Sequence, residues 1–179
     1  MIRPALIAAA LAFAAPSWAQ TADDARIAEA AAARDAYWRA IDDENYAAAY
    51  AMLTPGMQNL DTPQEAQKFN SDQRRDMGVA LERRVMRVTV YDNPASAPAP
   101  GVYIAFDVVG RFERADRNCG YIIMHQAAPG APWLVTRNDQ TFMSNADAAG
   151  PGQPDVAWAQ LATSFCPGWQ PSWVIQPPV

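Results

Sequence analysis

The alternation along residues 101–114, GVYIAFDVVGRFER, constrains the fold more than any other feature of the chain. Apolar side chains occupy its even positions, and its odd positions carry Asp107, Arg111 and Glu113. Because successive side chains of a strand point to opposite faces of a sheet, this spacing predicts a two-faced strand. Exposing the five apolar even-numbered side chains would cost about 1.5–3 kcal/mol each. We therefore expect the even face to be buried and the odd face to be exposed to water.

Three further segments show the same period of two and predict three more strands: residues 83–93, 119–126 and 133–142. The intervening segments are rich in Gly, Pro, Asp and Asn, which favour turns. Successive strands joined by short loops form an antiparallel meander. Gly110 interrupts the second strand and indicates a bulge or bend.

Helical periodicity precedes the strands. Residues 21–42 and 45–53 carry apolar side chains at steps of three and four, which predicts two helices. A third helix is expected to begin after Thr62, because Thr62, Pro63 and Glu65 form the pattern of a capping box with proline in the first turn. The predicted fold class is α+β, with three N-terminal helices packed on a curved four-stranded antiparallel sheet.

The ends of the chain differ in composition from this domain. Residues 1–19 combine Arg3, a short apolar run and small residues before Gln20, which predicts a secretory signal peptide. Residues 20–145 form the predicted α+β domain. Residues 146–179 are rich in Pro and Trp, with a helix expected over 155–165 whose buried side would carry Val156, Leu161 and Phe165. We interpret this last part as a stapled C-terminal extension.

Export would place the two cysteines, Cys119 and Cys166, in an oxidising compartment, the periplasm. Two cysteines in an exported chain most simply form one disulfide, which would tie the extension to the start of the third strand. The alternatives are two free, buried thiols or a pair of cysteine ligands to a metal. A metal would need further ligands, and His125 is the only imidazole, so we expect no metal.

Charge and motifs exclude several classes of function. The chain has a net charge of −5 and lacks a Lys/Arg run, which argues against a nucleic-acid partner. After residue 19, none of its apolar runs is long enough to span a membrane. We find no phosphate-binding glycine loop, nucleophile elbow or metal-ligand spacing, and we expect no cofactor.

Several local segments resemble an exported bacterial family, domain of unknown function 4019. They are AAAARDAYWRAIDDENYAAAYAML at residues 30–53, RRDMGVALERRV at 74–85, the strand at 101–114, and PWLVTRNDQTF at 132–142. The resemblance covers residues 26–143 and implies export and an NTF2-like, cystatin-like cone. It implies no activity, because the family has none established.

Cones of this kind often hold a pocket between sheet and helices. Here Tyr37, Trp38, Tyr50 and Phe106 are the candidates to line it, although aromatic side chains at this spacing are more often core. Catalysis there would need an acid or base in an apolar pocket, and Asp107 and His125 are the only candidates that we single out.

We expect a non-catalytic periplasmic module that binds a small apolar ligand or an envelope protein, or that forms a homodimer through its exposed sheet face. The alternative is a small isomerase- or hydratase-like enzyme with Asp107 or His125 as the base. A third possibility is that an envelope protein recognises the C-terminal extension.

Overall fold

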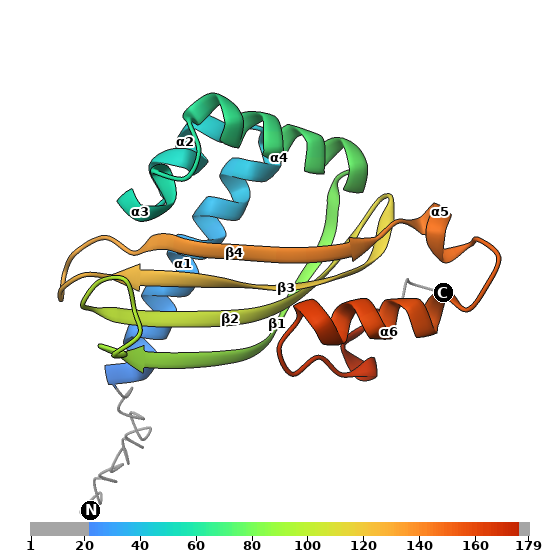
Figure 1. Cartoon of the computed structure of the whole chain (residues 1–179). Coiled ribbons are helices and arrows are strands. Elements are labelled where there is room, and N and C mark those ends of the chain that lie inside the picture. The colour runs from blue at the N-terminus through green and yellow to red at the C-terminus, as the bar shows by residue number, and fades with distance from the viewer. Residues whose placement is uncertain (1–21, 176–179) are drawn as a thin grey trace, which may run out of the picture.

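The computed structural model describes residues 22–175 and shows an α+β protein with one four-stranded sheet (Figure 1). The predicted signal peptide and its cleavage site lie outside the described residues. The helices are α1 (Ala22–Asp42), α2 (Tyr46–Ala51), α3 (Pro55–Gln58), α4 (Pro63–Met77), α5 (Asn145–Ala148), α6 (Pro154–Phe165) and the 3-10 helix η1 (Pro171–Trp173). The strands are β1 (Ala80–Asp92), β2 (Val102–Phe112), β3 (Ala115–Gln126) and β4 (Leu134–Met143).

The sheet is the predicted meander, with strand order β1-β2-β3-β4 and antiparallel pairing throughout. The register shifts between Gly110 and Phe112, which confirms the predicted irregularity in β2. β3 begins at Ala115 rather than at Cys119. The turn before it needs only the residues around Glu113 and Arg114, so the polar residues that we assigned to the turn extend the strand instead.

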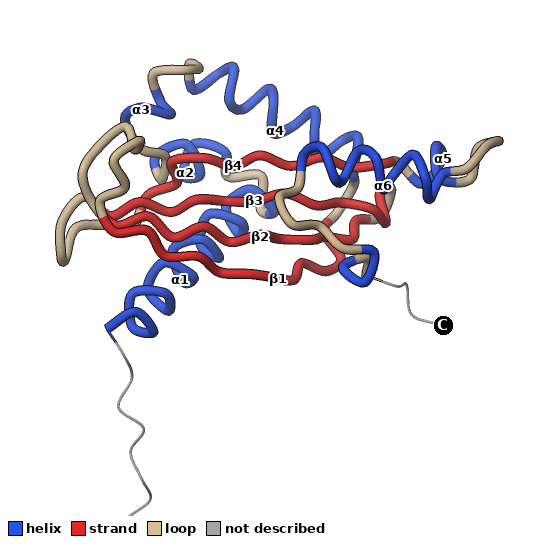
Figure 2. Tube along the Cα trace, turned by 60° about the horizontal axis from the view of Figure 1, so that its bottom comes forward, coloured by secondary structure: helices blue, strands red, loops and turns tan. Residues whose placement is uncertain are grey.

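One face of the sheet, the inner face, packs against α1 (Figure 2). Ile104 and Phe106 of β2 and Ile122 and Met124 of β3 are almost fully buried there, together with Tyr37 of α1. Burial of the even-numbered apolar side chains of β2 is therefore confirmed from Ile104 to Phe112, whereas Val102 is half-buried. The gain from covering this apolar surface is what holds the long helix against the strands.

The helices α3 and α4 begin at side-chain caps. The predicted capping box is present, since the Thr62 hydroxyl accepts from the Glu65 amide and the Glu65 carboxylate accepts from the Thr62 amide. Thr54 and Pro55, which directly follow the predicted helix over residues 45–53, start the short helix α3. The Thr54 side chain accepts from the Met57 amide at 3.4 Å, so the same residues act as an N-cap.

The opposite face of the sheet, the outer face, is partly covered by α6 and the segment after it. Cys119 of β3 and Cys166 form a disulfide with Cα atoms 6.0 Å apart, as predicted. Trp158 and Ala162 are the buried residues of α6, and the predicted Leu161 packs partly buried beside them. Val156 and Phe165 are exposed, so our expected buried side was wrong at these two positions. Residues 158, 162 and 166 are spaced four apart and therefore lie on one side of the helix. Because the disulfide holds Cys166 against the sheet, this is the side of α6 that becomes buried.

No helix within residues 22–175 combines the length and the apolar character that a membrane crossing requires.

Candidate functional site

One end of the outer face is covered by the loop between β1 and β2. The Tyr103 hydroxyl donates to the Ala99 carbonyl at 2.7 Å, and His125 Nε2 lies 2.9 Å from the Pro100 carbonyl. The rings of Tyr103 and His125 stack with their centroids 4.4 Å apart. Gly101 has a φ of +133° and lies so close to the Gln126 carbonyl that a side chain would clash with it. These contacts hold the proline-rich loop down on the sheet.

The other end is covered by the segment that follows the disulfide. Arg87 of β1 donates to the Pro167 carbonyl at 3.0 Å and forms an ion pair with Asp107 of β2. One guanidinium group therefore connects a buried carboxylate to the backbone of the C-terminal extension. The C-terminal extension is therefore held on the sheet by this contact as well as by the disulfide.

A groove of about 550 Å³ remains between these two coverings, and we call it the outer groove. The small or apolar side chains in its lining include Thr89, Ala105, Ile123 and Thr136, one from each strand. The lining also includes Arg87, Asp107, Tyr121, Arg137, Tyr91, Pro94, Pro98 and Pro167. Its volume lies within the usual range of small-molecule sites.

Asp107 is only 7 % exposed, so our expectation of a wet odd face was wrong at this position. Tyr103 on the same face is buried as well. The even-numbered side chains of this part of β2 are buried as well, so the strand is covered on both faces here. Alternation in one strand identifies two chemically different faces, but it does not show which distant segments fold over the polar one.

A row of polar side chains crosses the outer face beside Asp107. Asp107, Tyr121 and Asp139 occupy paired positions on β2, β3 and β4. The Tyr121 hydroxyl and the Arg137 Nε both donate to the same Asp139 oxygen at 2.7 Å. Burial, followed by the bond to Asp139, raises the pKa of Tyr121 to about 12, so the phenol remains a neutral hydrogen-bond donor.

His125, the second candidate base, does not reach this row. It is buried beneath the β1–β2 loop, stacked on Tyr103 and bonded to a backbone carbonyl. When Nε2 carries the proton, it donates to the Pro100 carbonyl. These contacts give His125 a structural task, which is to fix the loop that forms one wall of the outer groove.

The space between α1, α4 and the inner face is small. Tyr37 and Trp38 line a cavity of only about 50 Å³ there, together with Asn138 and Gln140. Burial raises the pKa of Tyr37, and its hydrogen bond with Asn138 opposes that effect. A cavity of this size suits ordered water rather than an organic ligand.

The remaining two residues that we expected in a pocket have other contacts. The Tyr50 hydroxyl donates to the Gln58 and Asp61 carbonyls. Phe106 is buried, and the guanidinium of Arg34 lies 4.5 Å from its ring centroid. Whether these four aromatic residues contact a ligand stays a prediction.

The outer groove can bind more readily than it can catalyse. Asp107 is already ion-paired, whereas general-base chemistry of the isomerase type needs an uncompensated carboxyl in an enclosed apolar pocket. Across residues 22–175, no group of three or more His, Cys, Asp or Glu side chains is placed to hold a metal ion. The outer groove offers a ligand hydrogen-bond donors and acceptors, on a sheet surface that also carries small and apolar side chains.

Sequence reasoning missed Arg87 and Tyr121 as members of this site. Each faces the same side of the sheet as Asp107, because each is paired with it in the register. Once the strands are aligned, the sequence does indicate this site, since polar or aromatic residues recur at the odd positions of three neighbouring strands. The alternation within one strand does not show how that strand is aligned with its neighbours.

Comparison with known proteins finds one family. The family described as protein of unknown function (DUF4019) matches residues 31–136, which is more than half of the chain. No curated protein and no solved structure matches the chain. The match runs from within α1 to the start of β4 and so includes the strands that carry Arg87, Asp107 and Tyr121. The chain belongs to this family of proteins of unknown function (DUF4019).

Proposed function

We propose that this protein is a non-catalytic binding module that holds a small, uncharged molecule in its outer groove. Asp107 carries the proposal: the residue is only 7 % exposed, yet it lines an open hollow of about 550 Å³. Burying a charged group is costly, and a chain that needed only a covered sheet would place an apolar residue here.

The lining of the groove indicates the chemistry of the ligand. Arg87 and Asp107 neutralise each other, and Arg137 pairs with Asp139 beside the groove, so a net charge on the ligand would meet no complementary field. Tyr91, Pro94 and Ile123 offer apolar contacts. A molecule with an apolar body and a few hydroxyl or amide groups fits this combination.

Ligand screening by NMR would test the proposal. We would add a library of uncharged organic fragments to the ¹⁵N-labelled protein and map the shifts of the floor residues. Ala105→Trp fills the groove, and Ala127→Trp places the same side chain on an exposed turn outside it. We expect fragments that perturb Ala105 and Ile123 in the wild type, bind the Ala127→Trp variant equally, and fail to bind a folded Ala105→Trp variant. Unchanged binding to the latter, or no fragment that perturbs the floor, would refute the proposal.

The cellular setting belongs to the same proposal. We infer that residues 1–19 are a signal peptide and that the mature domain is an NTF2-like cone working in the periplasm. The Cys119–Cys166 disulfide supports a non-cytoplasmic compartment. N-terminal sequencing of protein from the cell envelope is expected to begin at Gln20, and an intact Met1 would contradict this assignment.

An enzymatic role has less support, because Asp107 and His125 are both engaged with other residues and lie outside the space between α1 and the sheet. A homodimer through the outer face is opposed by the loop and the extension that cover much of that face.

A further inference from the structure

A second hollow, of about 510 Å³, lies along β4 beside the outer groove. Its lining includes residues 137–140, Phe69 and Gln73 of α4, Phe165 at the end of α6, and Pro167, and we call it the edge groove. It shares Tyr121, Arg137 and Pro167 with the outer groove, while neither phenylalanine lines the latter.

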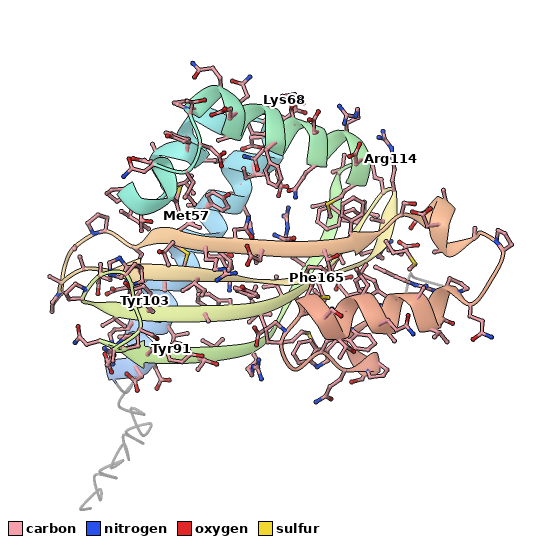
Figure 3. All side chains as sticks on the ribbon, viewed as in Figure 1. Met57, Lys68, Tyr91, Tyr103, Arg114 and Phe165 are labelled. Atoms are coloured by element: carbon pink, nitrogen blue, oxygen red, sulfur yellow. A yellow bond between two sulfur atoms is a disulfide. The ribbon has the colours of Figure 1, made fainter. Side chains whose placement is uncertain are left out.

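The edge groove lies against the open edge of the sheet. β4 is an outermost strand, and four of its consecutive residues border the hollow. Neighbouring residues in a strand point to opposite faces, so a space that touches all four must run beside the strand rather than over one face. Helix α4, which carries Phe69, borders the small cavity at the inner face together with Asn138, so Phe69 approaches from the inner side. Phe165 at the end of α6 approaches from the outer side, toward which Asp139 points (Figure 3).

The same edge already accepts a main-chain partner from within the protein. The Thr54 amide donates to the Val135 carbonyl, and the Val135 amide donates to the Met52 carbonyl, each at 2.9 Å. Leu53 thereby forms a parallel bridge with Val135. Among the described residues, these are the backbone bonds made to this edge, and the edge groove begins two residues further along β4.

An exposed aromatic side chain stands on each side of the edge groove. Phe69 is 61 % exposed and Phe165 is 59 % exposed, although both are large aromatic side chains. The charges between them cancel, because Arg137 and Asp139 form an ion pair at 2.7 Å. Exposed aromatic side chains beside a neutral strand edge are typical of a surface that a partner covers.

We propose that the edge groove binds an extended peptide segment of another protein, which adds to β4 as a fifth strand. Its main chain would bond to β4, and its alternate side chains, apolar and uncharged, would contact Phe69 on one face and Phe165 on the other. The four residues of β4 in the groove correspond to about 13 Å of strand. The peptide and the small ligand of the outer groove would be different molecules, although the two grooves share Tyr121, Arg137 and Pro167.

Selection from a random octapeptide display library on the purified protein would test this. We expect enriched peptides with alternating apolar residues, whose affinity falls about tenfold with Phe69→Ser or Phe165→Ser. Leu60→Ser is the matched control, because Leu60 is 72 % exposed and lies outside the groove. N-methylation of alternate peptide amides is expected to abolish binding in one register, because it removes donors while keeping the side chains.

Three results would overturn the inference. Failure to enrich any peptide that distinguishes the serine variants from Leu60→Ser is one, and full retention of affinity after N-methylation in both registers is another. The third is sedimentation showing a dimer that the Phe69→Ser and Phe165→Ser variants dissociate, which would identify the occupant as a second copy. Peptide binding that survives Ala105→Trp would separate this site from the proposed function, whatever the outcome of the fragment screen.

Discussion

Arg87 of β1 and Asp107 of β2 stand directly opposite each other in the sheet and form an ion pair on its outer face. The same guanidinium reaches the Pro167 carbonyl of the C-terminal extension. A single cross-strand pair therefore joins the strands, the extension and the outer groove, and changing it should affect all three.

Arg87→Leu is expected to destabilise the protein by about 2 kcal/mol, because it leaves the Asp107 carboxylate buried without its cation. We place the loss below that of a fully buried pair, because the Arg87 side chain is 47 % exposed. Urea unfolding measures the change. Arg84→Leu is the control, since Arg84 pairs with Glu82 on the same strand but at the surface, and its loss should stay within about 0.5 kcal/mol. The double variant Arg87→Leu/Asp107→Leu should recover part of the stability, and further loss there would contradict the explanation.

Replacing both cysteines by alanine is expected to lower the free energy of unfolding by roughly 4 kcal/mol, because the disulfide closes a loop between residues 47 apart. The extension would also lose its covalent anchor, so limited proteolysis should cut near residues 150–153 faster than in the wild type. Calorimetry and a timed digest measure the two effects. A loss below 1 kcal/mol with unchanged digestion would show that Trp158 and Ala162 hold α6 in place without the disulfide.

Thr62→Ala is expected to cost about 1 kcal/mol, because it removes the side-chain half of the capping box at the start of α4. Ser71→Ala, within the same helix, removes a hydroxyl that bonds only to the Lys68 carbonyl and should change stability by less than about 0.5 kcal/mol. Thermal unfolding of the two variants gives the comparison. Equal effects would indicate that the cap does not hold α4.

The raised pKa of Tyr121 predicts a loss of stability in alkali. Its pKa is about 12 in the folded protein against a reference value of 10, so the folded state retains a proton that the unfolded state releases. This contribution is complete below pH 10 and is lost as the pH rises toward 12. Tyr121→Phe should therefore show a shallower fall in stability across this window, while Tyr91→Phe serves as the exposed-tyrosine control. Absorbance of tyrosinate at 295 nm follows the titration directly, and identical curves for wild type and Tyr121→Phe would contradict the prediction.

Local spacing was sufficient to predict the helices α1, α2 and α4, the four strands and their antiparallel order. These features depend on propensities, caps and the period of apolar residues, all of which act over a few neighbouring residues. The pairing of Cys119 with Cys166 was also predictable, because the chain has only these two cysteines and they have no other partner within it.

The outer groove and the edge groove depend on contacts between distant segments. Asp107 is buried because the β1–β2 loop and the segment around Pro167 fold over a polar face that its own strand would leave wet. Phe165 is exposed because the stripe that ends at Cys166 turns Trp158 toward the sheet instead. The periodicity of a strand or helix determines which side chains share a face. Which segments cover that face depends on contacts between residues far apart in the sequence, through burial of apolar surface and through the disulfide.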